Sequence, residues 1–403
     1  MLNMLLHILI AIALGIFAGI ITGLTPGIHI NLVSLLVMTS APFLLKYTSL
    51  LPLCVFIVSM SVTHTFLDFI PSVFIGAPSS DTVLMILPGH KMLLEGKSRN
   101  AVYLTLIGSF FSLLSALLLM PFLVKFTKLM YTLIKDYIGI ILLLIVIYMV
   151  LKDKNRKTNI LVFFMSSILG LITFELPLNQ PLFPLLSGLF GLSILLNSLF
   201  DEINIPKQDS EIKLTLNKLE SAKAVAAATI AGMFTAFFPG LGSSHGAVLA
   251  SQFLRKISIE GFMILVGGIN TVNFVLSLVT WYTLEKARNG SVVVMKEILP
   301  NITAQHLFLF GLSALIAGCF SVILGIWLSK IFAGLIEKVN YTMLISVVCI
   351  FIIILSYVFS GWLGMMVLFT GTCIGFIPIK LGTPKNHLMG CLLTPVIIYF
   401  IMG

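Results

Sequence analysis

The chain has 403 residues, of which 59% are hydrophobic and only 10% are charged, and its formal net charge is +9. These values exclude a soluble globule, because the long uncharged runs would leave it no water-facing side. The basic residues are scattered over short loops, which argues against nucleic-acid binding and is typical of the cytoplasmic loops of a membrane protein. We therefore expect a multi-pass protein of the cell (plasma) membrane.

The hydrophobic runs predict helices, since the alternation of polar and apolar positions that a membrane barrel needs is missing. The first Lys or Arg is Lys46, so we expect no cleavable signal peptide and a retained first helix. Each half of the chain gives seven segments, about 3–24, 30–45, 48–76, 101–124, 137–151, 158–174 and 181–199 in the first, and about 224–238, 243–254, 261–284, 303–329, 339–358, 361–379 and 386–402 in the second.

The two halves contain a related short sequence. Residues 18–27 read AGIITGLTPG and residues 231–240 read AGMFTAFFPG, with five identical positions in ten. This match indicates an internal duplication, so we predict an all-α integral membrane protein with one repeat at 1–199, a second at 224–403, and a polar, solvated linker at 200–223.

An odd number of segments in each repeat predicts that the second repeat is inverted relative to the first. Loop charges give a test, because equivalent loops of inverted repeats lie on opposite sides of the membrane. The loop 152–157 is basic whereas its counterpart near Gly361 is uncharged, and the loop 380–385 is basic whereas its counterpart holds only Glu175. The basic residues of 125–135 go against this scheme.

Both repeats have a Pro-Gly pair between short segments, which predicts re-entrant or broken helices whose tips meet near the middle of the membrane. Pro interrupts a helix, Gly lets the backbone approach a ligand, and the N-terminus of the next helix attracts a carboxylate or phosphate. The alternative is that Pro and Gly only kink the helices. The candidate substrate-binding residues are Thr25, Pro26, Gly27, His29 and Asn31 in the first repeat, and Pro239, Gly240, Gly242, Ser243, Ser244 and His245 in the second.

Asp68 lies within an apolar segment, where an acid costs about 2.5 to 3.5 kcal/mol at a helix centre. Such a residue usually faces a cavity or a partner, so we predict that it takes part in coupling to Na⁺ or H⁺. The alternative is a position near the interface or a purely structural pair. A weak alignment at an offset of 205 places Asn270 and Asn273 in the matching helix as further ion-coupling candidates.

A third Pro-Gly pair, Pro88-Gly89, follows a secondary polar loop. That loop is formed by Ser79, Ser80, Asp81 and Thr82, which serve either as helix caps or as substrate contacts. The sequence contains no HExxH, GxSxG, Walker or paired-carboxylate pattern, so we expect neither an enzyme nor a metal site. The only cofactor expected is a coupling ion.

The stretches GLTPGIHIN, FPGLGSSHG and GAPSSDTVLMILPGHKMLLEGKSRNAV resemble the large membrane subunit of tripartite tricarboxylate transporters, and more closely its shorter, stand-alone archaeal-type relatives. The resemblance covers most of the chain. It implies inverted repeats, secondary transport driven by Na⁺ or H⁺, and, in bacteria, a small membrane subunit and a periplasmic binding protein. It further implies that the loops Pro26-Gly27 and Pro239-Gly240 bind a carboxylate, and that Pro88-Gly89 through Gly96 match the loop after the first core.

The chain is shorter than the bacterial permeases, and its second half shows no counterpart of Pro88-Gly89. The expected function is ion-coupled transport of a small organic anion, a di- or tricarboxylate, bound between the two Pro-Gly loops. Translocation of an anionic lipid carrier such as a polyprenyl phosphate stays open as an alternative, and it would require a groove open laterally to lipid. The expected partners are the organic anion and the bilayer; accessory subunits and a homodimer are left open.

Overall fold

The structure is a computed structural model that describes residues 2–25, 30–76, 82, 84, 86–152, 155–200, 206–209, 211–212, 214, 217–237, 242–254, 257–287 and 289–402. Within these residues the chain is helical and has no strand, which confirms the all-α fold class. Eight helical stretches in this part are long and apolar enough to cross a membrane.

The helices follow one another in an order that is closely similar in the two halves. The first half contains α1 (Leu2–Leu24), α2 (Ile30–Leu44), α3 (Leu50–Leu67), α4 (Phe69–Phe74), α5 (Ile86–Leu94), α6 (Ser98–Ile134), α7 (Ile138–Lys152), α8 (Arg156–Glu175), α9 (Leu182–Leu186) and α10 (Ser193–Phe200). The second contains α11 (Lys218–Phe237), α12 (Ser243–Phe253), α13 (Ile259–Leu284), α14 (Gly290–Ile298), α15 (Ala304–Ile336), α16 (Tyr341–Leu381) and α17 (Gly390–Met402).

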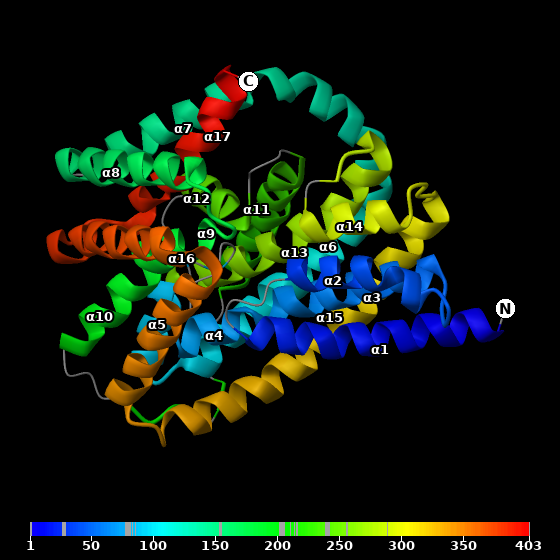
Figure 1. Ribbon diagram of the computed structural model, residues 1–403, viewed down its shortest axis with the longest axis horizontal. Helices are drawn as coiled ribbons and strands as arrows, with labels where there is room; N and C mark the ends of the chain where they lie inside the picture. Colours follow the sequence, from blue (N-terminus) through cyan, green and yellow to red (C-terminus); the bar gives the residue numbers. More distant parts are fainter. Residues whose placement is uncertain are drawn as a thin grey trace.

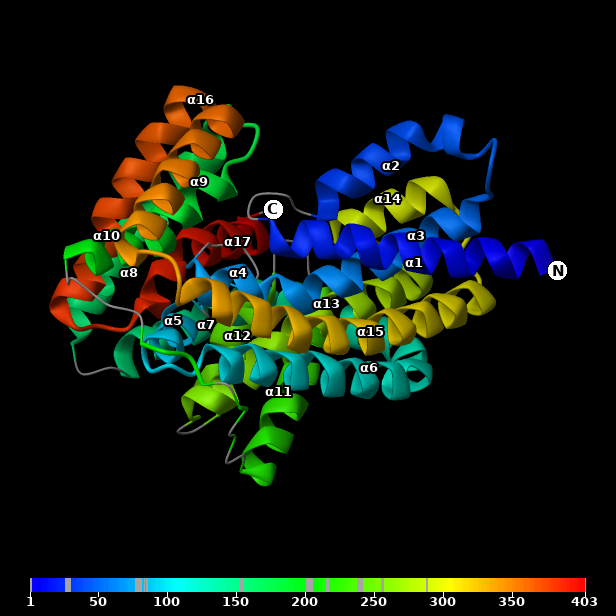
Figure 2. The same cartoon turned by 90° about the horizontal axis from the view of Figure 1, so that it is seen from below.

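The helices α3 and α13 form the centre of the molecule and are the most deeply buried of the membrane-length helices. Their packing is reciprocal: α1 lies along α3 and α11 along α13, while α6 of the first half covers α13 and α15 of the second half covers α3. Figures 1 and 2 show this group together, with α7 to α10, α16 and α17 beside it. Each half thus supplies part of the cover of the other half's central helix.

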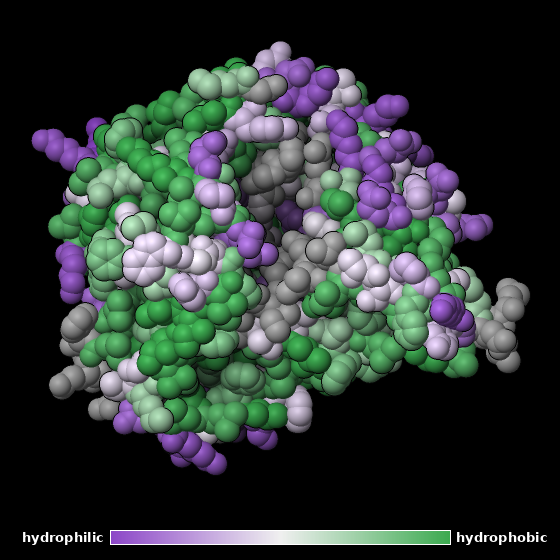
Figure 3. Space-filling model, viewed as in Figure 1, coloured by the Kyte–Doolittle hydropathy of each residue, from purple (hydrophilic) through white to green (hydrophobic). Residues whose placement is uncertain are grey.

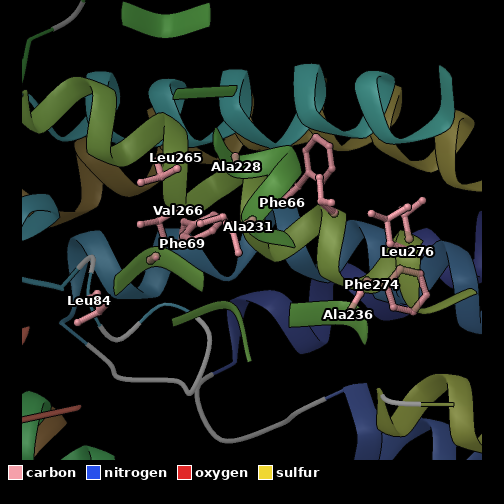
Figure 4. Packing of buried hydrophobic residues seen from close by; sticks show 14 of the residues in the cluster. Phe66, Phe69, Leu84, Ala228, Ala231, Ala236, Leu265, Val266, Phe274 and Leu276 are labelled. Atoms are coloured by element: carbon pink, nitrogen blue, oxygen red, sulfur yellow. The ribbon is translucent and has the colours of Figure 1, made fainter. Parts of the chain in front are cut away.

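Apolar side chains fill the space between the central helices. Figure 4 shows one part of this core, in which Phe66 and Phe69 of the first half lie near Ala231 of α11 and Val266 of α13. At the outer surface the pattern is reversed, because α1, α6, α15 and α16 expose many large apolar residues. Apolar residues cover much of the face seen in Figure 3, as expected of a surface in contact with lipid, and hydrophilic residues lie at its margins and also near its centre.

Glycines allow the central helices to approach closely. A Cβ atom on Gly19 of α1 would lie 2.5 Å from Thr63 Cβ of α3, and one on the repeat-related Gly232 of α11 would lie 2.7 Å from Val272 Cβ of α13. Gly108 of α6 is tighter still, since its Cβ would lie 2.0 Å from the carbonyl oxygen of Ile264. The AGxxT sequence that α1 and α11 share therefore serves helix packing, and in both halves it is followed by a Pro-Gly pair.

The helices α6 and α15 occupy equivalent places in the two halves and run antiparallel, side by side. Leu106, near the start of α6, lies against Gly325 toward the end of α15, whereas Leu117, further along α6, lies against Gly311 near the start of α15. Figure 2 shows the same opposite directions. This arrangement is the one that an inverted repeat would produce for this pair, while the inversion of the whole repeat stays a prediction.

One predicted helix boundary was wrong and another is confirmed. Residues 125–134, expected as a loop, continue α6, and only a short 3₁₀ turn at Lys135–Tyr137 separates it from α7, because the stretch contains no Gly or Pro to stop the helix. The break expected between the segments 339–358 and 361–379 is confirmed, because the range labelled α16 contains two helices that meet at a kink at Gly361, where φ is 59°. Polar residues alone do not end a membrane helix, whereas a glycine in the left-handed region interrupts it.

The sequence analysis did not predict the short helices α5 and α14. They lie at equivalent positions, α5 between α4 and α6 and α14 between α13 and α15. The second half therefore does have a helix in the place of α5, although α14 lacks the Pro-Gly pair. Each helix has nine residues, which are too few to cross a bilayer, so a search for membrane-length apolar runs finds neither of them.

The linker is exposed at Lys207, Asp209 and Glu211, in keeping with a solvated connection, but Gln208 is buried. Its side chain donates to the carbonyl of Leu93 at the end of α5 (3.1 Å) and accepts from the N–H of Ser98 at the start of α6 (3.2 Å). Its own N–H donates to Glu337 Oε1, at the end of α15, over 2.6 Å. The linker thus ties the α5–α6 corner to the end of α15, and its last residues already form the start of α11.

We expect Gly108→Ala to lower the free energy of unfolding by at least about 2 kcal/mol, because the added methyl group would overlap the backbone of α13. The matched control is Gly334→Ala in α15, where a Cβ meets nothing within 4 Å and stability should be unchanged or slightly higher. Thermal unfolding in detergent measures both. Equal stability of the two variants would contradict the close contact of α6 with α13.

We expect Gln208→Ala to destabilise the protein by about 2 kcal/mol, since the Ser98 N–H and the Leu93 carbonyl would lose their buried side-chain partner. The neighbouring Lys207 has an exposed side chain, so Lys207→Ala provides the control and should unfold at the wild-type temperature. A Gln208→Ala protein as stable as the control would mean that the Gln208 side chain contributes nothing to holding the α5–α6 corner.

Candidate functional site: a buried polar contact between the two halves

Asp68 lies at the junction of α3 and α4, in the interior of the molecule, with 7% of its surface exposed. The helix is interrupted here because Pro71 has no N–H to donate to the carbonyl of Leu67. The backbone is nevertheless held in place: the Asp68 N–H donates to the His64 carbonyl (2.9 Å), and Ser72 Oγ donates to the Asp68 carbonyl (3.2 Å). The junction therefore fixes the carboxylate in the core.

The Asp68 carboxylate accepts a hydrogen bond from the other half of the chain. Asn270 Nδ2 of α13 donates to Asp68 Oδ2 over 2.9 Å, and Ser243 Oγ, at the first residue of α12, donates to Asn270 Oδ1 over 3.2 Å. His64 Nε2 lies 3.9 Å from the same Asp68 oxygen and forms an ion pair with it when protonated. Three residues that the sequence analysis singled out, Asp68, Asn270 and Ser243, are thus connected in one chain of hydrogen bonds.

The start of α12 is organised by its own histidine. His245 Nδ1 accepts from the N–H of Gly242 over 3.1 Å, so this nitrogen carries no proton and the imidazole helps to cap the helix. Ser243, Ser244 and His245 are all buried. This end of α12 directly follows the second Pro-Gly pair, and its orientation depends on the bond from Ser243 to Asn270.

Asn273 makes a separate contact, one turn further along α13. Its Nδ2 donates to Thr235 Oγ1 of α11 over 2.7 Å, and Thr235 Oγ1 in turn donates to the Gly232 carbonyl over 3.1 Å. In the first half, Thr22 Oγ1 likewise donates to the Gly19 carbonyl, at 3.3 Å. Asn273 therefore fixes the end of α11 ahead of the second Pro-Gly pair and, in these bonds, is not part of the Asp68 chain.

The third Pro-Gly pair lies against the same region through α4. Thr82 of the secondary polar loop shares a hydrogen bond of 2.7 Å with Ser72, one turn after Asp68. A Cβ on Gly89 would lie 3.0 Å from Val73 Cγ2, which explains a glycine at this close approach of α5. Burial lowers the pKa of the adjacent His90 to about 4, so this histidine is neutral at pH 7.

Several predicted site residues lie outside the described residues, namely Pro26, Gly27, His29, Ser79, Ser80, Asp81, Pro239 and Gly240. The side chain of Asn31 also lies outside them. Thr25 is described and follows the last turn of α1, with its N–H donating to the Ile21 carbonyl over 3.1 Å. The structure thus gives the surroundings of both Pro-Gly tips but not the tips themselves.

Sequence reasoning did not assign a role to His64, Ser72 or Thr235. The first two could have been found, because His64, Asp68 and Ser72 recur every four residues along an otherwise apolar segment and so share one helix face. The partner of Asn273 was not predictable in the same way. It depends on the crossing of α11 and α13, which a one-dimensional pattern does not contain.

The membrane-length helices and their buried polar centre define a multi-pass helical membrane protein. The chain belongs to the tripartite tricarboxylate transporter TctA family, whose model matches residues 9–390. This is a family of transporter membrane components and not of enzymes, and its members usually work with other components of the tripartite system.

The chain is also similar to an uncharacterized protein of Methanocaldococcus jannaschii. The two are 31% identical over 393 residues, which cover 94% of this chain and 95% of the relative. No solved structure matches the chain.

We expect Asn270→Ala to cost about 2 to 3 kcal/mol of stability, because it removes a donor from a buried carboxylate. Asn273→Ala removes a bond to a neutral hydroxyl and should cost only about 1 kcal/mol. Thermal or denaturant unfolding of both variants, which lie on the same helix, measures the difference. A smaller cost for Asn270→Ala than for Asn273→Ala would contradict a buried, ionised Asp68.

Proposed function

We propose that the protein is an ion-coupled secondary transporter of a small organic anion of the di- or tricarboxylate class, located in the plasma membrane. The observation that supports this most directly is the chain from Asp68 through Asn270 to Ser243. It connects a buried acid of the first half to the helix start that follows the second Pro-Gly pair. Ionisable groups within membrane helices are costly, and where they occur they usually serve substrate or ion pathways.

The regions that flank the two Pro-Gly pairs converge on this contact. In the first half, Gly23 in the last turn of α1 lies against the Cβ of Leu67 and the backbone of His64 and Asp68. In the second half, Ser243 follows the tip closely and is bonded to Asn270. Both tips are therefore joined to elements that meet at Asp68 and Asn270, which supports a common site between them. The positive end of the α12 dipole at this helix start would favour an anion there.

The packing also supports two repeats in opposite orientation, at 1–199 and 224–403. The reciprocal cover of α3 and α13 and the antiparallel pair α6 and α15 are both features that inverted repeats produce. In transporters built this way, substrate and coupling ion bind at the repeat interface near the bilayer midplane. Asp68 and Asn270, which come from different halves, occupy such an interface.

The proposal predicts that citrate or succinate raises the unfolding temperature of the purified protein. A ligand at about 100 times its Kd stabilises the folded state by about 2.7 kcal/mol. Ser243→Ala should reduce this shift, because Ser243 orients the start of α12. The control is Ser346→Ala, since Ser346 is exposed on α16 and bonds only within its own helix to the Thr342 carbonyl, at 2.8 Å.

The same measurement with a polyprenyl phosphate tests the alternative substrate class. Stabilisation by the lipid phosphate and not by any carboxylate would mean that the protein is a lipid-carrier translocase and not an organic-anion carrier. If carboxylates raise the unfolding temperature equally in wild type and in Ser243→Ala, the proposed function stands but the proposed site is wrong.

A further inference from the structure

We infer that the protein binds a phosphate group, either of a phospholipid headgroup or free in solution, at the corner where the chain between α16 and α17 packs against α8. Asn159 of α8, together with Thr383 and Lys385 ahead of α17, forms this corner. The corner is separate from the residues proposed to bind the substrate, so the inference goes beyond the proposed function.

The polar side chains of this corner are buried without a partner. In the described part of the chain, neither side-chain oxygen nor nitrogen of the fully buried Asn159 has a hydrogen-bond partner, and the same holds for Thr383 Oγ1 and Lys385 Nζ. Lys385 forms no ion pair with a described acid either. Water could satisfy the amide and the hydroxyl, whereas keeping a buried ammonium group charged requires an anion beside it.

The turn that leads into α17 covers the face of α8 that carries Asn159. This 3₁₀ turn spans Lys385–Met389 and packs against α8, where the carbonyl of His387 accepts from Ser166 Oγ over 3.2 Å. Asn159 precedes Ser166 by about two helical turns and therefore lies on the same face of the helix. The amide of Asn159 is thus buried on the side of α8 from which the turn approaches.

The order of the contacts directs Lys385 toward the start of α8. Cys391, near the start of α17, lies against Gly170, and His387 lies against Ser166, which is nearer the start of α8. Following the chain back from α17 therefore leads toward the first turns of α8. Lys385 is the first residue of the 3₁₀ turn and lies furthest along this direction.

The position of the corner favours a phosphate group. Both α8 and the stretch Lys385–Met402 are long and apolar enough to cross a membrane, so they begin at a bilayer surface, where lipid phosphates are found. The exposed residues Arg156, Lys157 and Lys380 add positive charge there. An ammonium group, an amide and a hydroxyl are three separate donors, which suit the several acceptor oxygens of a phosphate.

Thermal unfolding of the purified, delipidated protein in a neutral detergent tests the inference. We expect phosphatidylglycerol to raise the unfolding temperature by about 3 °C relative to phosphatidylcholine, whose phosphate is neutralised by its own choline. Sodium phosphate is compared with sodium chloride at equal ionic strength. An equal rise with sodium phosphate would identify free phosphate as the ligand, and a rise with the lipid alone would identify the headgroup.

Lys385→Met should abolish the rise. Without any phosphate this variant should be at least as stable as the wild type, because an unpaired buried charge is removed. The matched control is Lys380→Met, the same change at an exposed lysine, which should keep the full rise. Asn159→Leu removes the amide and should reduce the rise.

The inference would be overturned by the lack of a rise with either phosphate compound, by a full rise in Lys385→Met, or by an equal loss in Lys380→Met. Asp153, which precedes α8, lies outside the described residues, so a double-mutant cycle of Asp153→Asn with Lys385→Met decides whether this acid neutralises the lysine. We expect additive effects, and coupling between the two would also overturn the inference. Citrate and succinate are absent from these measurements, so a failure of the proposed function would leave the result unaffected.

Discussion

The burial of one carboxylate constrains the centre of this molecule. Asp68 lies where α3 gives way to α4, and an ion at that depth requires a donor from a neighbouring helix. Asn270 of α13 supplies it at 2.9 Å, so the two central helices have a fixed register relative to each other. The bond from Ser243 then fixes the start of α12 as well. This chain of hydrogen bonds therefore connects Asp68 of the first half to two helices of the second half, α12 and α13.

Glycines and polar residues have different roles at this centre: glycines allow close packing, and polar residues form buried hydrogen bonds. Gly19, Gly232 and Gly108 bring the helices so close that a side chain at any of them would overlap its neighbour. Without a hydrophobic driving force between helices in lipid, such close packing and a few buried hydrogen bonds are what hold helices together. The duplicated AGxxT sequences are therefore explained by packing on α3 and α13, and only the Pro-Gly pairs that follow them need a functional explanation.

The sequence allowed the helical class, most membrane segments and the polar candidates to be predicted, because apolar runs and intramembrane acids are local features. It did not reveal that Asp68 meets Asn270 rather than Asn273, although both asparagines lie on α13. That choice depends on how α3 and α13 cross in three dimensions, which the order of residues along the chain does not contain. The same limit applies to Gln208: a polar stretch indicates a solvated linker, and only the folded chain shows that one of its residues is buried.

The position of Gln208 bears on how the two halves could move. It joins the α5–α6 corner of the first half to Glu337 at the end of α15, while Asp68 and Asn270 join α3 to α13 deeper in the core. Rocking of one repeat against the other, as in alternating access, must keep or break each of these connections. The linker contacts lie at helix ends, and one of them is a bond from the Gln208 N–H to the Glu337 carboxylate. The central contact joins a buried acid of one half to an amide of the other, so any such motion must carry Asp68 and Asn270 together or break their bond.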